Sequence, residues 1–315
     1  MRVVMGRCLG QVSAIMLALL IACTHVALAQ SASSGEMGRM YPGRAVWIWK
    51  ATRSIVLDAQ AREAFFAFAA RNPPLTRVFL AATWAIRVET PASERAALRS
   101  FLVQAHERGL VVDLLAGDKK WATPEGYRSV DQLLDDLARW QTSAVVEGLP
   151  SGIFDGLQLD VEPYLLAEWP SPELFEGWIG MTQRVRHFLD DRAHLQLVFG
   201  LAIPIWLDKE KYQFINEPLQ AASDYVALMD YRDSAARVIR DALGEIEVAD
   251  RLGKIVYVGV NTQDVKGDPP STTFFQEGRA LMEEELAKAA EELVQYPSFA
   301  GFAIHHFESY TQLKP

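Results

Sequence analysis

Short apolar runs alternate with longer amphipathic stretches from residue 45 onward, and this alternation limits the folds open to the chain. We expect strands at 45–49, 77–81, 110–115, 153–163, 195–202, 225–231, 255–260 and 299–304. Strands that alternate with helices form parallel sheets. Eight such units predict a single closed (β/α)8 barrel, the TIM-barrel architecture, with an open doubly wound sheet as the alternative. Only residues 305–315 follow the last strand, so the eighth helix should be short or missing.

Polar residues with capping patterns predict where several helices begin. Asp58 and Ser171 are single N-cap candidates, and the latter is followed by proline. Thr90-Pro91 predicts a third start, while Ser129-x-x-Gln132 and Thr273-x-x-Gln276 have the spacing of capping boxes. A helix is therefore expected to open at each of these positions.

The N-terminus has the pattern of an export signal. Arg2 and Arg7 precede an apolar run and then small residues that end at Ala29, which predicts a signal peptide over residues 1–29. The run also resembles a lipoprotein signal ending at residue 22, in which Cys23 would become the lipidated first residue. We expect an exported protein, either periplasmic or secreted, or anchored by a lipid on Cys23.

The remaining chain divides into a polar linker at 30–42 and a barrel domain at 43–315. We expect no transmembrane span in the mature chain, and a monomer. The formal net charge of −9 argues against nucleic acid or an anionic membrane as a partner. Both cysteines, Cys8 and Cys23, lie in the leader, which excludes a disulfide, a thiol nucleophile or a cysteine-based zinc site from the barrel. No cofactor is expected.

Two carboxylates end the run at 153–163. Side chains two apart on a strand share a face, so Gln158, Asp160 and Glu162 should point the same way. The active sites of such barrels lie at the carboxyl ends of the strands. Two carboxylates in that dry mouth should raise the pKa of at least one of them, as a general acid requires. The alternative is a structural cluster in which both pair with arginine or lysine.

Polar and aromatic residues also follow the other expected strands. The candidates for contact with a ligand are Trp49, Asp118, Trp121, Trp206, Asn261, His305 and Glu308. Aromatic rings stack on the apolar faces of sugars, and carboxylates act on the glycosidic oxygen. A rim of this composition therefore favours a carbohydrate site.

The segment Asp155-Gly-Leu-Gln-Leu-Asp-Val-Glu162 resembles the strand-four signature of glycoside hydrolase family 18, Asp-Gly-x-Asp-x-Asp-x-Glu. The family comprises chitinases and endo-β-N-acetylglucosaminidases. Met229-Asp230-Tyr231 resembles the family's strand-six Met-x-Tyr. Three departures are visible: Gln158 replaces the middle aspartate, Arg232 follows Tyr231 where the family usually has aspartate or asparagine, and no tryptophan closes strand eight.

This resemblance implies a mechanism. Glu162 would protonate the leaving oxygen, and Asp160 would orient the substrate's 2-acetamido group for attack on the anomeric carbon. Tyr231 would hydrogen-bond the acetamido oxygen, with Met229 and Gln158 beside it. Because Gln158 is an amide, it can hydrogen-bond Asp160 but cannot relay a proton to it.

Three other interpretations remain open. A retaining pair of carboxylates could use Glu162 with Glu308. Histidine and carboxylate side chains could hold a metal ion, the candidates being Asp118, Asp160, Glu162, His305 and His306. The chain could also be a non-catalytic sugar-binding protein on a degenerate hydrolase barrel. The sequence favours an exported glycoside hydrolase that acts on a polysaccharide or oligosaccharide.

Overall fold

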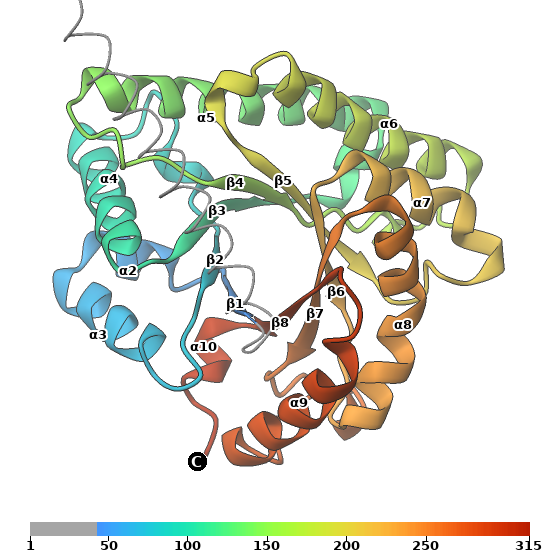
Figure 1. Cartoon of the computed structure of the whole chain (residues 1–315). Helices are drawn as coiled ribbons and strands as arrows, with labels where there is room; N and C mark the ends of the chain where they lie inside the picture. Colours follow the sequence, from blue (N-terminus) through green and yellow to red (C-terminus); the bar gives the residue numbers. More distant parts are fainter. Residues whose placement is uncertain (1–42) are drawn as a thin grey trace, which may run out of the picture. The chain divides into compact units, whose positions relative to one another are not determined.

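The computed structural model describes residues 43–315, with the side chain of residue 145 left out. The expected signal peptide and linker lie outside the described residues. Eight strands pair in sequence order into a closed, all-parallel barrel, as Figure 1 shows. They are β1 (Gly43–Ile48), β2 (Arg77–Leu80), β3 (Val111–Ala116), β4 (Gly156–Leu159), β5 (Val198–Pro204), β6 (Tyr225–Met229), β7 (Ile255–Asn261) and β8 (Phe299–His305). The predicted (β/α)8 barrel is confirmed.

Helices surround the barrel and connect its strands (Figure 1). They are α2 (Thr52–Leu57), α3 (Ala59–Ala69), α4 (Ala92–Glu107), α5 (Tyr127–Val146), α6 (Pro172–Asp190), α7 (Gln213–Ala222), α8 (Ala235–Leu252), α9 (Arg279–Leu293) and α10 (Phe307–Tyr310). The last of these has only four residues, so the eighth helix is short, as expected. None of the described helices is both long and apolar enough to cross a membrane.

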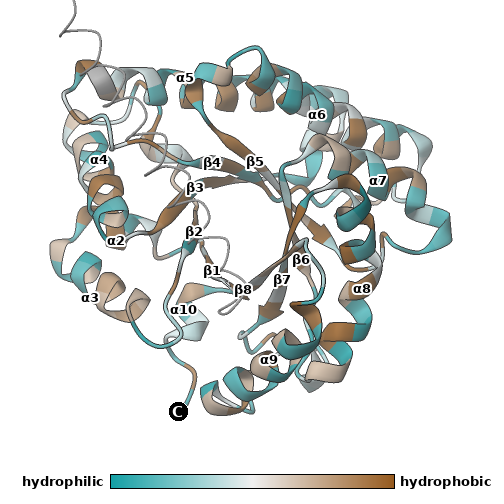
Figure 2. Cartoon of the chain, viewed as in Figure 1, coloured by the Kyte–Doolittle hydropathy of each residue, from teal (hydrophilic) through white to brown (hydrophobic). Residues whose placement is uncertain are grey.

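Two apolar cores lie on opposite sides of the sheet. In β1, Val46 and Ile48 face outward into the large core between strands and helices. Ala45 and Trp47 face inward, where they join a smaller cluster inside the barrel. This alternation follows from the two-residue period of a strand. In Figure 2 the strands are largely brown, while the surrounding helices carry both brown and teal residues.

A polar group fills the amino-terminal end of the barrel. The carboxylate of Asp113 is fully buried and lies 2.5 Å from Nη1 of Arg77. The hydroxyl of Tyr225 donates to the same carboxylate oxygen at 2.5 Å. Burial raises the pKa of Asp113, and the positive charge of Arg77 opposes that rise. The interior is therefore sealed at this end, which leaves the carboxyl end for a site.

Four strands are shorter than the sequence predicts. The pairing of β4 with β3 stops at Leu159, because β3 itself ends at Ala116, so Glu162 follows the strand instead of lying on it. β6 ends at Met229, two residues early, and β5 begins at Val198, after a short 3₁₀ turn. The expected limits 153–163, 225–231, 195–202 and 77–81 are therefore wrong, and the observed limits are 156–159, 225–229, 198–204 and 77–80.

The predicted helix starts are partly correct. Asp58 accepts a hydrogen bond from Ala61 N, and Ser171 accepts one from Leu174 N, so both are N-caps. Ser129 instead lies inside α5, which begins two residues earlier. Thr273 lies in the loop before α9, where its hydroxyl donates to Gln263 O.

The start of α4 also differs from the prediction. Its N-cap is Pro91, and the hydroxyl of Thr90 donates to Trp84 O. The hydroxyls of Thr90 and Thr273 thus donate to carbonyl oxygens outside α4 and α9, and neither residue caps its helix. Spacing along the chain cannot reveal such a competition.

Helix α6 contacts the turn after β3 through a glycine. A Cβ atom at Gly177 would overlap the carbonyl oxygen of Ala122, in the 3₁₀ turn Lys119–Ala122 that also carries Trp121. We expect Gly177→Ala to lower the free energy of unfolding by about 1–3 kcal/mol, because the backbone of α6 or of the turn must move to relieve the overlap.

A second glycine of the same helix provides the control. A Cβ at Gly180 would meet only the Tyr127 hydroxyl, at 2.9 Å, which can move. Gly180→Ala should be close to neutral, because a gain in helix propensity of about 1 kcal/mol offsets the cost of moving the Tyr127 hydroxyl. Urea unfolding of both variants checks this, and equal losses would contradict it.

Candidate active site

A cleft of about 660 Å³ opens at the carboxyl ends of β4 to β7. Its walls include five of the residues singled out in the sequence, which come from the ends of four strands. They are Glu162, Trp206, Met229, Tyr231 and Asn261. Parallel strands that close into a barrel bring their carboxyl ends to one face, which is why residues so distant in sequence meet here.

Asp160 and Glu162 lie half-buried just after β4. Burial, and then the nearby charge of Glu162, raises the pKa of Asp160 to about 7. Its Oδ1 atom is buried and has no hydrogen-bond partner in residues 43–315. Neither carboxylate forms an ion pair with an arginine or lysine among the described residues. The expectation of at least one raised pKa is confirmed, and the interpretation as a salt-bridged structural cluster is not supported.

Tyr164 contacts the expected acid, and the sequence reasoning missed it. Its hydroxyl donates to Oε2 of Glu162 at 2.5 Å. Its ring centroid lies 5.2 Å from that of Trp206, in the wall of the same cleft. The only sequence signal was a tyrosine placed just after Glu162-Pro163, where a tight turn returns the side chain over the carboxylate.

Tyr231 and His305 form a neutral group in the barrel mouth. Burial, followed by the charges of Asp160 and Glu162, raises the pKa of Tyr231 well above 10, so its phenol stays protonated. The ring of His305 lies 5.4 Å from that of Tyr231 and 5.9 Å from that of Trp47. Burial, and then His306, lowers the pKa of His305 to about 3, which keeps the imidazole neutral.

Gln158 is fully buried beneath the two carboxylates. Its Oε1 accepts a hydrogen bond of 2.8 Å from Nε1 of Trp47. Because an indole N–H can only donate, this bond fixes the amide orientation and leaves Nε2 as the free end. Nε2 has no partner among the described residues. The Gln158 amide is thus a hydrogen-bond donor of fixed orientation that cannot take up or release a proton.

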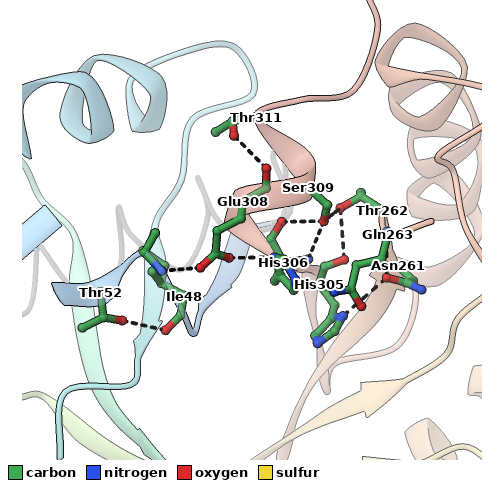
Figure 3. A network of polar contacts seen from close by, with 11 residues as sticks. Ile48, Thr52, Asn261, Thr262, Gln263, His305, His306, Glu308, Ser309 and Thr311 are labelled. Atoms are coloured by element: carbon green, nitrogen blue, oxygen red, sulfur yellow. Dashed lines mark hydrogen bonds and ion pairs between the residues drawn. The ribbon is translucent and has the colours of Figure 1, made fainter. Parts of the chain in front are cut away.

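Glu308 has a different set of contacts, shown in Figure 3. One oxygen accepts a hydrogen bond from Ala51 N at 2.5 Å, and the other lies 2.6 Å from Nδ1 of His306. Although burial acts to raise its pKa, the contacts with His306 and Ala51 lower the pKa of Glu308 to about 2. The hydrogen bond with Ala51 joins α10 to the residue that precedes α2. Glu308 does not line the cleft of Glu162, so a retaining pair with Glu308 has no support.

His306 belongs to the polar group around Glu308 and does not line the cleft of Glu162. Nε2 of His306 lies 2.5 Å from Nε2 of Gln263. Nδ1 of His305 lies 3.4 Å from Oδ1 of Asn261, which also accepts from Gln263 N (Figure 3). The group therefore holds the ends of β7 and β8 together beside the cleft.

Three predicted residues lie elsewhere. Trp49 and Trp121 line a second hollow of about 650 Å³ at the ends of β1 to β3. Asp118 is exposed and lines a third hollow of about 730 Å³, and its carboxylate accepts from Lys120 N. The turn after β3 directs the Asp118 carboxylate to the backbone N–H of Lys120. Asp118 is therefore not brought to Glu162, contrary to the grouping expected from the sequence.

The proposed metal ligands do not assemble. Asp118 is in the separate hollow, and His306 is occupied by Gln263 and Glu308. Within residues 43–315, no three histidine, aspartate or glutamate side chains lie close enough together to hold a metal ion. The metal interpretation has no support in this arrangement.

Two further carboxyls are fully buried in the described part of the chain. Burial, and then Asp241, raises the pKa of Asp230 to about 8. Burial, and then Asp208, raises the pKa of Glu245 to about 9. Asp230 lies between Met229 and Tyr231 in the sequence, but it is buried and does not line the cleft that those two residues line.

Comparison with solved structures adds the context of the fold. A chitinase from Chromobacterium violaceum superposes with a TM-score of 0.51 at 12% identity, over 86% of this chain and 96% of that one. A family 18 chitinase from Pseudoalteromonas aurantia gives 0.50 at 14% identity, over 85% and 94%. A chitinase from Bacteroides thetaiotaomicron gives 0.50 at 13%, over 86% and 93%.

This chain has the barrel fold of family 18 chitinases. The resemblance expected from the strand-four and strand-six motifs is thereby confirmed at the level of the fold. No protein-family model and no curated protein sequence matches the chain. Fold similarity leaves the chemistry to be argued from the cleft itself.

The raised pKa of Asp160 has a consequence for stability. Between the pKa of an unfolded aspartate, about 3.9, and its folded value, the folded chain holds a proton that the unfolded chain has lost. The free energy of unfolding therefore falls as pH rises from about 4 to about 7. Asp160→Asn removes this loss, so its melting temperature should exceed that of wild type more at pH 8 than at pH 4.

Circular dichroism melts at both pH values check this expectation. Asp230 and Glu245 give the same trend in both proteins, so the difference between the variant and wild type isolates Asp160. Asp264→Asn, at an exposed loop position, serves as the matched control. A gain in stability that is the same at pH 4 and pH 8 would contradict the assignment.

Proposed function

We propose that this chain is an exported glycoside hydrolase that cleaves a polysaccharide or glycan with N-acetylated sugars, and that Glu162 is its general acid. The observation that supports the proposal is the cleft itself: Glu162, Tyr231 and Trp206 line one cavity, with Asp160 beside them. A carboxyl, a neutral phenol and an indole ring are the groups that a glycosidic bond with an acetamido neighbour requires.

The reaction proceeds by substrate assistance. Glu162 gives its proton to the glycosidic oxygen, and the bond from that oxygen to the anomeric carbon breaks with its electron pair on the leaving oxygen. The acetamido oxygen of the same sugar forms the new bond to the anomeric carbon. Water then opens this ring, and Glu162 accepts the proton of that water.

Asp160 and Tyr231 position the acetamido group. Ionised Asp160 accepts the acetamido N–H and stabilises the positive charge that develops on the nitrogen. The phenol of Tyr231, which stays protonated, donates to the acetamido oxygen. With a pKa of about 7, Asp160 is ionised in about half of the molecules at neutral pH.

Gln158 changes how Asp160 is supported. In the resembled family the corresponding aspartate exchanges a proton with its neighbour, which an amide cannot do. Trp47 fixes the orientation of the Gln158 amide, and its Nε2 makes no hydrogen bond with Asp160 or with any other described residue. Gln158 therefore leaves the raised pKa of Asp160 to burial and to the charge of Glu162.

The first experiment is reducing-end release by the purified mature protein from N-acetylated and neutral polysaccharides. We expect release from the N-acetylated members, and Glu162→Gln should lower it by at least about 100-fold, the usual contribution of a general acid. Glu176→Gln, at an exposed position on α6, is the matched control and should leave release unchanged.

Other results select other interpretations. Release only from neutral polysaccharides would exclude acetamido assistance. Undiminished release by Glu162→Gln would remove Glu162 from the mechanism. Binding of a polysaccharide without release would favour the sugar-binding protein on a degenerate barrel, for which Gln158 is the supporting departure.

A further inference from the structure

The side chain of Tyr164 is held over Glu162 from two directions. Its hydroxyl donates to Oε2 of Glu162 at 2.5 Å. A short 3₁₀ turn, Pro163–Leu165, follows Glu162, and Leu165 N donates to Glu162 O at 3.0 Å. This turn sends the side chain of Tyr164 back toward the carboxylate that precedes it by two residues.

Three tryptophans hold the ring in this place. Its centroid lies 5.2 Å from Trp206, 6.2 Å from Trp169 and 6.4 Å from Trp178. Trp178 is buried in α6, and Trp206 follows β5, so the ring is fixed by two elements of the barrel wall. A phenol packed in this way loses little further entropy when it makes a hydrogen bond.

The phenol is a permanent donor. Burial, followed by the charge of Glu162, raises the pKa of Tyr164 well above its usual value of about 10. Tyr164 therefore keeps its proton wherever the enzyme would operate. Oε2 of Glu162 is occupied by this bond, while Oε1 has no hydrogen-bond partner among the described residues.

We propose that Tyr164 is a positioning residue for Glu162, which holds Oε2 so that Oε1 is the oxygen that delivers the proton to the glycosidic oxygen. This inference rests on the proposed function, since it assigns the acid's proton to one of its two oxygens. As the proton leaves Oε1, the bond to the leaving group breaks and a full negative charge develops on the carboxylate. The Tyr164 O–H···Oε2 bond remains throughout.

The bond favours the transition state over the ground state. A hydrogen bond to an ionised acceptor is stronger than one to a neutral acceptor, so the contact strengthens while Glu162 loses its proton. Interactions that strengthen in this way raise kcat and leave KM largely unchanged. Loss of one such bond corresponds to a rate decrease of about 10- to 100-fold.

Tyr164→Phe is the direct test, since it removes the hydroxyl and keeps the ring. We expect kcat to fall about 10- to 100-fold and KM to change less than about twofold. A loss in kcat without a matching change in KM is the readout that a merely structural role of the hydroxyl would not give.

Tyr212→Phe is the matched control. Tyr212 belongs to the same aromatic cluster, with its ring 4.8 Å from that of Trp206, but it does not contact Glu162. Removal of its hydroxyl should leave kcat and KM unchanged. An undiminished kcat in Tyr164→Phe, or an equal loss in Tyr212→Phe, would overturn the proposal.

A second measurement separates this proposal from the proposed function. Carbon-13 NMR of protein labelled at the glutamate carboxyl carbon gives the chemical shift of Glu162, identified by the signal that Glu162→Gln removes. At one fixed pH, Tyr164→Phe should move this signal, and Tyr212→Phe should leave it in place. If it does so while no polysaccharide is cleaved, the contact is established and the hydrolase proposal fails. If the signal does not move in Tyr164→Phe, the role of Tyr164 is refuted whether or not the chain is active.

Discussion

The pairing of β1 with β8 is the interaction on which the rest of the structure depends. Ala45 pairs with Ala303 and Val46 with Ile304, and this closes the sheet into a barrel. Closure removes both sheet edges and divides every strand into an inward and an outward face. It also brings all eight carboxyl ends to one rim, so side chains from β4 to β7 can share one cleft.

Closure also explains why the same end of the barrel carries the chemistry. Arg77, Asp113 and Tyr225 fill the amino-terminal end with a polar group in which the Asp113 carboxylate is paired with a cation. At the carboxyl end, Asp160 has no cationic partner among the described residues, and burial raises its pKa. A charge left unneutralised at one end and neutralised at the other is typical of a fold that separates stability from function.

Side chains from several strand ends form one connected group in the barrel mouth. Trp47 orients Gln158, which departs from the family 18 signature, and its ring also contacts His305 at the end of β8. His305 in turn contacts Tyr231. A change at one of these positions therefore meets neighbours that other strands contribute.

Much of the fold followed from the sequence, because strand and helix periods are local properties. Eight alternations predicted the barrel, and too few residues after the last strand predicted the short α10. The N-caps Asp58 and Ser171 were also readable, whereas Ser129 and Thr273 were not. A capping pattern says that a hydroxyl can bond a helix end, but the loop carbonyl that competes for it comes from the tertiary structure.

The residues of the candidate site also fall into two groups, those that the sequence predicted and those that only the tertiary structure placed. The sequence by itself predicted that Asp160 and Glu162 lie at the carboxyl end of one strand, that Tyr231 lies at that of another, and that both ends meet at the mouth of a barrel. The structure places all three residues just beyond their strands. Only the tertiary structure decided that Asp118 turns to backbone, that Glu308 bonds Ala51 and His306, and that Tyr164 lies against Glu162. Strand order fixes which ends meet, whereas the direction of each side chain beyond a strand depends on the packing of the loop that carries it.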